Sequence, residues 1–119
     1  MLVKAIRMID QNQTPAKSAE VKQIVNLLQY QNNSIVSRVL LKNKGGTVTL
    51  FAFDAGEGLS ENTAPFDALV VVVDGKADIE ISGESFGVEQ GETIVLPANR
   101  PHAVKAATKF KMLLIMIRA

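Results

Sequence analysis

The chain has 119 residues, the commonest size of a single domain, and it can bury a core without disulfides or a structural metal. It contains no cysteine, which excludes disulfides, thiol nucleophiles and thiolate metal sites. Thirteen basic and twelve acidic residues give a net charge of +1, and there is one tyrosine and no tryptophan. We therefore expect neither nucleic acid nor an anionic membrane surface as a partner.

The N-terminal third is polar and gives ambiguous signals. Lys4 and Arg7 interrupt its first apolar residues, so no signal peptide is expected. No segment approaches the ~20 apolar residues of a membrane span, and we expect a cytoplasmic protein. Residues 10–20 contain Pro15 and are predicted to form a loop, whereas the apolar spacing over 21–30 fits either a short helix or a strand at 24–29.

From residue 34 the chain alternates between short apolar runs and turns that contain glycine or proline. The first two runs form a predicted hairpin around residues 42–46, and the sequence predicts a bent loop over 54–65 and a turn at Asp74-Gly75. Strands are predicted over 34–42, 47–53, 69–73, 76–82, 85–88, 93–96, 102–106 and 110–117. Strands at this spacing indicate an all-β barrel or sandwich in one domain, 1–119, with an N-terminal arm over 1–33 and a barrel over 34–117.

Two of the predicted strands are apolar on both faces, LVVVV at 69–73 and MLLIMI at 112–117. In a closed barrel one face of each strand points inward and the other meets solvent unless something covers it. Two interpretations remain open, and they are compatible. The runs are buried central strands of a sandwich, or they belong to a homodimer that buries an outer sheet face.

Two segments carry a family resemblance. The first, 56–75, begins at Gly56 and ends at Gly75, and the second, 91–106, contains Gly91, Pro97 and His102. Their spacing resembles the two signature motifs of the cupin family, and the resemblance extends over 34–117. It implies a double-stranded β-helix, or jelly-roll, barrel with a short N-terminal extension.

The resemblance also implies where a metal would lie. In the family, two histidines and a glutamate of the first motif and a histidine of the second hold a divalent metal. Here Asn62, Ala64 and Ala68 occupy the first three positions, and His102 alone is retained. A neutral amide is a poor donor and alanine offers none, so no metal ligands and no cofactor are expected. A divalent metal held by a reduced ligand set is the alternative.

Strand alternation predicts what fills the barrel. If Ala68 points inward, its neighbour Asp67 points outward, and Val70 and Val72 share the inward face. Met112, Leu114 and Met116 also share one face. The predicted interior is then apolar with two polar groups, and it either binds a small molecule or is filled by its own side chains. The candidate ligand-binding residues are Asn62, Ala64, Ala68, Val70 and His102.

Other polar residues near the motifs have simpler interpretations. Glu57, Glu61 and Asp67 are carboxylates in the loop of the first motif, and Glu61 and Asp67 are expected to be solvated or capping charges. Arg100 is expected to lie on the surface, with an anionic ligand as its alternative partner. The family also includes metal-free sugar epimerases that use a histidine and a tyrosine, but Tyr30 lies outside both motifs.

Three functional hypotheses follow, and the sequence leaves open whether the protein is an enzyme. The first is a metal-free binding or accessory module for a small apolar or weakly polar molecule. The second is a metal-dependent oxygenase or isomerase with a reduced ligand set. The third is a structural or interaction protein that works through its outer apolar face.

Overall fold

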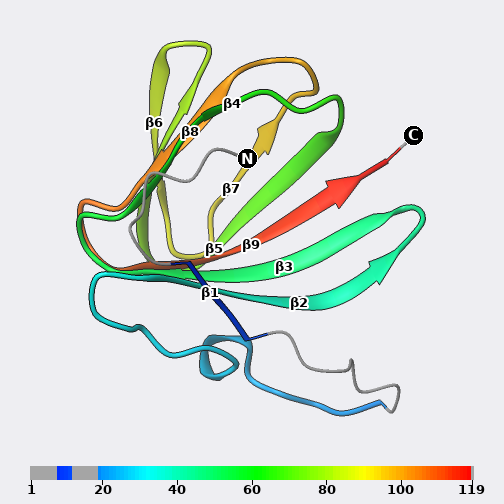
Figure 1. Cartoon of the computed structure of the whole chain (residues 1–119), viewed down its shortest axis with the longest axis vertical. Helices are drawn as coiled ribbons and strands as arrows, with labels where there is room; N and C mark the ends of the chain where they lie inside the picture. Colours follow the sequence, from blue (N-terminus) through cyan, green and yellow to red (C-terminus); the bar gives the residue numbers. More distant parts are fainter. Residues whose placement is uncertain (1–7, 12–18, 119) are drawn as a thin grey trace.

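The structure is a computed structural model that describes residues 8–11 and 19–118. Almost all of its regular structure is β, which confirms the predicted class (Figure 1). No helix in the described part of the chain is long and apolar enough to cross a membrane. The elements are β1 (Met8–Asp10), η1 (Ile24–Asn26), β2 (Ile35–Asn43), β3 (Gly46–Phe53), β4 (Gly58–Asn62), β5 (Asp67–Ile81), β6 (Glu84–Glu89), β7 (Thr93–Leu96), β8 (His102–Lys105) and β9 (Phe110–Ile117).

The strands form a double-stranded β-helix barrel with β5 at its centre. The first half of β5 pairs with β7 and β9, and β9 continues through β3 and β2 to β1, which makes the larger sheet. The second half of β5 pairs with β6 and β8, and β8 pairs with β4, which makes the smaller sheet. Every pairing is antiparallel except that of β1 with β2.

The predicted turn at Asp74-Gly75 is wrong, because β5 runs through it as one strand of 15 residues. The ladder with β9 shifts register between Val72 and Asp74, and the strand passes from the larger sheet to the smaller one at this irregularity. Gly75 has φ +73°, and a Cβ there would overlap the Lys109 carbonyl oxygen. The Asp-Gly pair therefore provides a bend and a close backbone approach rather than a chain reversal.

Two further expectations need correction. The predicted loop over 54–65 contains β4, in which Gly58 allows a close approach to β8, since a Cβ would lie 2.7 Å from the Val104 carbonyl oxygen. In the segment 21–30 the strand alternative is wrong, and the helix is a single three-residue 3-10 turn, η1, rather than a stripe along the whole segment. Most of the predicted loop at 10–20, residues 12–18 with Pro15, lies outside the described residues.

The inward face of the barrel is apolar, and aromatic rings fill one end of it. The rings of Phe53 and Phe110 stack with centroids 4.5 Å apart, and Phe51 lies 6.0 Å from Phe53. The structure places the residues predicted to share inward faces in this core, namely Val70, Val72, Met112 and Leu114.

The N-terminal segment covers part of the outer face of the larger sheet (Figure 1). Leu28 is fully buried there against Val36, Leu50 and Ala52, which forms a second, smaller apolar cluster. Part of the double-sided apolar character of β5 and β9 therefore comes from contact with this segment, because Val73 and Leu113 pack against the same cluster.

A buried lysine fastens the segment to the sheet. Lys111 is 5% exposed, and its Nζ donates hydrogen bonds to the carbonyl oxygens of Val25, at 2.6 Å, and Leu28, at 2.7 Å. The same ammonium lies 4.8 Å from the centroid of the Tyr30 ring. The Tyr30 hydroxyl donates to Asp74 Oδ2 at 2.6 Å, and burial together with this carboxylate raises the pKa of Tyr30 well above 10.

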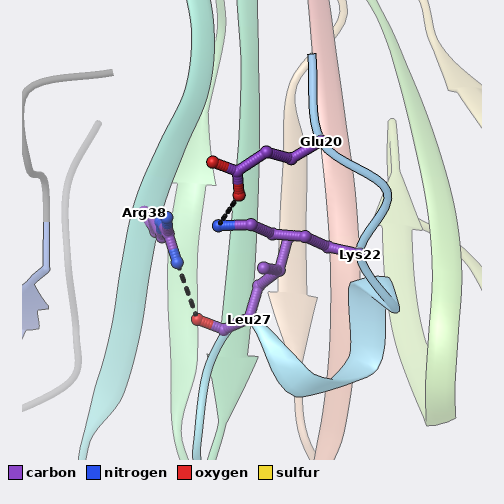
Figure 2. A network of polar contacts seen from close by, with 4 residues as sticks. All are labelled: Glu20, Lys22, Leu27 and Arg38. Atoms are coloured by element: carbon purple, nitrogen blue, oxygen red, sulfur yellow. Dashed lines mark hydrogen bonds and ion pairs between the residues drawn. The ribbon is translucent and has the colours of Figure 1, made fainter. Parts of the chain in front are cut away.

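A second polar link lies near the exposed side of the segment (Figure 2). Arg38 of β2 donates from Nη1 to the Leu27 carbonyl oxygen at 3.3 Å. Close by, the ammonium of Lys22 pairs with Glu20 at 3.3 Å. Both side chains of that pair are about half exposed, so the pair contributes little to stability, and Lys111 is the stronger anchor.

Candidate functional site

The candidate site lies where β4 and β8 meet at one end of the barrel. In the antiparallel ladder Asn62 of β4 stands opposite His102, the first residue of β8. On its other side His102 pairs with Ile81 of β5. Directly opposed residues of an antiparallel pair project from the same face, so the imidazole and the amide are neighbours.

A small, largely enclosed cavity lies beside this pair. Four of the five candidate residues line it, namely Asn62, Ala64, Ala68 and His102. The remaining wall is formed by Phe66, Leu96, Leu114 and Met116. The volume is about 30 Å³, which has room for about two water molecules, whereas pockets for drug-sized ligands have about 300–1,000 Å³. In this conformation the barrel is largely filled by its own side chains.

His102 is the chemically distinctive group of the cavity. Its side chain is 8% exposed, and burial lowers the pKa of the imidazole below 6.5, an effect that a backbone hydrogen bond with Arg100 partly opposes. The imidazole is therefore neutral at pH 7. Its Nδ1 is buried and has no hydrogen-bond partner among the described residues. An unsatisfied buried nitrogen of this kind costs about 1–3 kcal/mol, which a polar group reaching it would recover.

The remaining candidate, Val70, lies one step deeper. It is fully buried and pairs with Leu114 of β9, but it does not line the cavity. Sequence reasoning missed Phe66 and Leu96. Phe66 lies two residues before Ala68, so extending the strand alternation backwards would have indicated the same face, but Pro65 obscures the pattern.

The residues present do not fit a transition-metal site. Asn62, Ala64 and Ala68 stand at the positions of three family ligands, and no group of three or more histidine, aspartate or glutamate side chains within 8–11 and 19–118 is arranged to hold a metal ion. Asp67 does not compensate. Ala68 lines the cavity, whereas Asp67 is exposed and its Oδ1 accepts a hydrogen bond from the Ala98 amide at 2.8 Å.

The other charged candidates do not line the cavity. Arg100 is exposed and donates from Nε to Ser82 Oγ at 3.0 Å, and Glu61 is also exposed. Glu57 borders a separate open groove with Asp78 and Lys105. The structure places Asp67 in the capping role that was expected of it and Arg100 on the surface.

Tyr30 and His102 lie on opposite sides of the barrel wall. Tyr30 belongs to the outer cluster under the N-terminal segment, whereas His102 lines the internal cavity. A single substrate cannot contact both groups, so the arrangement excludes the two-residue epimerase chemistry.

The chain combines a double-stranded β-helix barrel, the two spaced motifs and a histidine at one end of the barrel. This combination defines the cupin class, and comparisons with known proteins place the chain within it. The Cupin domain family profile matches residues 49–118, and the chain belongs to this family. A conserved protein of unknown function from Streptococcus pyogenes is 28% identical, with a TM-score of 0.82, over 100% of this chain and 96% of that one.

Two further solved structures agree. A cupin 2 conserved barrel domain protein from Leptotrichia buccalis is 42% identical, with a TM-score of 0.77, over 79% of this chain and 46% of that one. The chain thus matches less than half of that protein. A cupin superfamily protein from Desulfitobacterium hafniense is 24% identical and shows the same fold, with a TM-score of 0.82 over 89% of this chain and 97% of that one. A comparison with curated proteins found no match.

Proposed function

We propose that this cupin domain is a metal-free module that binds a small, uncharged, apolar or weakly polar molecule at the Asn62–His102 end of the barrel. The observation that carries the proposal is that these two polar residues stand side by side on adjacent strands in the wall of an otherwise apolar cavity. Such a lining suits an apolar body with one hydrogen-bonding group. A charged ligand is disfavoured, since the lining offers no opposite charge and burying an unpaired charge is costly.

Thermal melting with a panel of small metabolites tests the proposal. A ligand at one hundred times its dissociation constant stabilises the fold by about 2.7 kcal/mol and raises the melting temperature. Ala64→Val narrows the cavity and should abolish the shift, whereas Ala55→Val, at an exposed alanine, should keep it. The proposal fails if no compound shifts the melting temperature, or if the shift is the same in both variants.

Elemental analysis tests the metal-free part separately. Protein purified without chelators should contain metal well below one equivalent, because one imidazole with alanine neighbours does not make a stable site. One equivalent of metal that is lost in His102→Ala would instead support a metal-dependent enzyme with a reduced ligand set.

A specific observation supports a homodimer as well. The register places Val95, Leu69, Ile115, Val48 and Leu41 in one row across five strands, on the outer face of the larger sheet. Val95 is 54% exposed and Leu41 67% exposed, and Ile117, next to the row, is 61% exposed. The row continues the face that the N-terminal segment covers, and a twofold axis needs only this one patch on each copy.

Light scattering after size exclusion tests the dimer. The wild-type protein should have twice the mass of the chain, and Val95→Lys should give the mass of one chain. Val21→Lys is the matched control, because Val21 is fully exposed on the N-terminal segment and away from the row. A wild-type protein with the mass of one chain would refute the dimer.

A further inference from the structure

We propose that the loop at residues 63–66 is the gate of the cavity, that it opens to admit the ligand, and that Asp67 and Arg118 hold it closed. This inference rests on the proposed binding function and says how the ligand reaches the site. The need for a gate follows from the volume, since about 30 Å³ excludes any organic ligand unless part of the wall moves.

The opposite end of the barrel gives no route. The stacked rings of Phe53 and Phe110 occupy it, and both residues are fully buried. Phe51, which is 9% exposed, extends this aromatic block. The way in must therefore be at the end where Phe66 and Met116 form part of the wall.

The loop at 63–66 lies outside the hydrogen-bonded ladders of the two sheets. It joins β4 to β5 without belonging to either, and Thr63 and Pro65 are exposed. At its C-terminal side the Asp67 carboxylate accepts the Ala98 amide at 2.8 Å, and within it the Ala64 carbonyl accepts the Asn99 amide at 2.7 Å. Segments held by a few exposed hydrogen bonds open at low free-energy cost.

The loop at 97–101, which bonds to Ala64 and Asp67, is the fixed side of the gate. It is tied to the β5–β6 turn by a second set of bonds, from the Ser82 amide to the Pro101 carbonyl at 2.8 Å and from Arg100 Nε to Ser82 Oγ at 3.0 Å. Loop 63–66 can therefore swing away while 97–101 stays with the smaller sheet.

Phe66 is the side chain that moves when the gate opens, and a cation–π contact with Arg118 stabilises its closed position. The ring lines the cavity, and the exposed Arg118 guanidinium lies 5.4 Å from its centroid. The backbone of Arg118 is fixed to the β2–β3 turn, since its amide donates to the Gly45 carbonyl at 2.8 Å. Displacing the ring would join the cavity to solvent beside His102, the polar group that a ligand would meet.

The single histidine of the chain makes the gate measurable without knowing the ligand. Diethyl pyrocarbonate is a small neutral reagent that must enter the cavity to reach His102. An imidazole nitrogen forms a bond to its carbonyl carbon, the anhydride C–O bond breaks, and ethyl carbonate leaves and decomposes to carbon dioxide and ethanol. Peptide mapping by mass spectrometry gives the rate at His102, scaled to the rate for free N-acetylhistidine.

Asp67→Ala removes the acceptor of the Ala98 amide and should raise the rate at His102 about tenfold, which corresponds to about 1.4 kcal/mol in the opening equilibrium. Asp67→Asn keeps an acceptor oxygen and should restore most of the protection. Phe66→Ala should give the largest increase. Glu84→Ala, at an exposed carboxylate on β6, is the matched control and should leave the rate unchanged.

Two results would overturn the gate. One is a wild-type rate equal to that of free N-acetylhistidine, which would mean that His102 is not enclosed. The other is a slow rate that Asp67→Ala and Phe66→Ala leave unchanged, which would place the opening elsewhere. If the variants accelerate the reaction and no compound shifts the melting temperature, the gate stands and the binding proposal fails.

Discussion

Lys111 offers the sharpest test of how the N-terminal segment is held on the barrel. Its ammonium donates to two backbone carbonyls of the segment, those of Val25 and Leu28. Lys111→Met preserves the length and apolar stem of the side chain but leaves both acceptors without their donor. The Leu28 acceptor is buried and the Val25 acceptor is part-buried. Each acceptor left unsatisfied costs about 1–3 kcal/mol, so we expect a loss of about 2–6 kcal/mol of unfolding free energy.

Urea denaturation followed by circular dichroism measures this loss. With an m-value of about 2 kcal/mol/M, the midpoint should fall by about 1–3 M. Lys109→Met is the control, because Lys109 is exposed and lies 5.6 Å from the same Tyr30 ring. It should change the free energy by less than about 0.5 kcal/mol. If Lys111→Met also stays within that margin, the lysine does not anchor the segment.

Three more predictions follow from the geometry. Because the pKa of Tyr30 is raised in the folded state, the unfolding free energy should fall as pH rises above about 10, and Tyr30→Phe should flatten that fall in urea titrations between pH 8 and 11. The pKa of His102 is lowered, so its NMR titration midpoint should lie below about 6.5. The unfolding free energy should therefore decrease as pH falls below about 6.5, and this decrease should be absent in His102→Gln. Gly75→Ala should lower the unfolding free energy, measured in urea, by at least about 2 kcal/mol, because overlap of the new Cβ adds to the strain of positive φ. Gly83 also has positive φ but nothing lies within 4 Å of its Cβ position, so Gly83→Ala should lower it by about 1–2 kcal/mol. Equal losses in the two variants would contradict the close approach at Gly75.

The sequence predicted the barrel because its strands carry their own signal. The hairpin of β2 and β3 follows from two apolar runs around a glycine-containing turn, and the second half of β5 follows from the alternation of 76–81; neither needs tertiary information. β4 was missed because its five residues begin at a glycine and become a strand only by pairing with β8. At Asp74-Gly75 the local turn preference was overridden by pairing on both sides of the bend.

The sequence predicted most of the residues of the candidate site but not the volume of its cavity. Motif spacing pointed to Asn62 and His102, and the structure brings them opposite each other. How much space remains beside them depends on the packing of Phe66 and Met116. The residues that line the cavity come from five separate strands and a loop, so no local pattern encodes their packing.

The continuous course of β5 has a consequence for how the protein unfolds. A single strand of 15 residues pairs centrally in both sheets, so the two sheets share a strand and cannot separate without breaking its pairing. Melting of one sheet frees half of β5 and removes the support of the other, which couples the two sheets into one cooperative unit. The slowest amide protons of Val70 and Val72 in one half of β5 and of Ile79 in the other should therefore exchange with the same free energy, that of global unfolding. The strand that contributes Ala68 to the wall of the cavity thus also couples the unfolding of the two sheets.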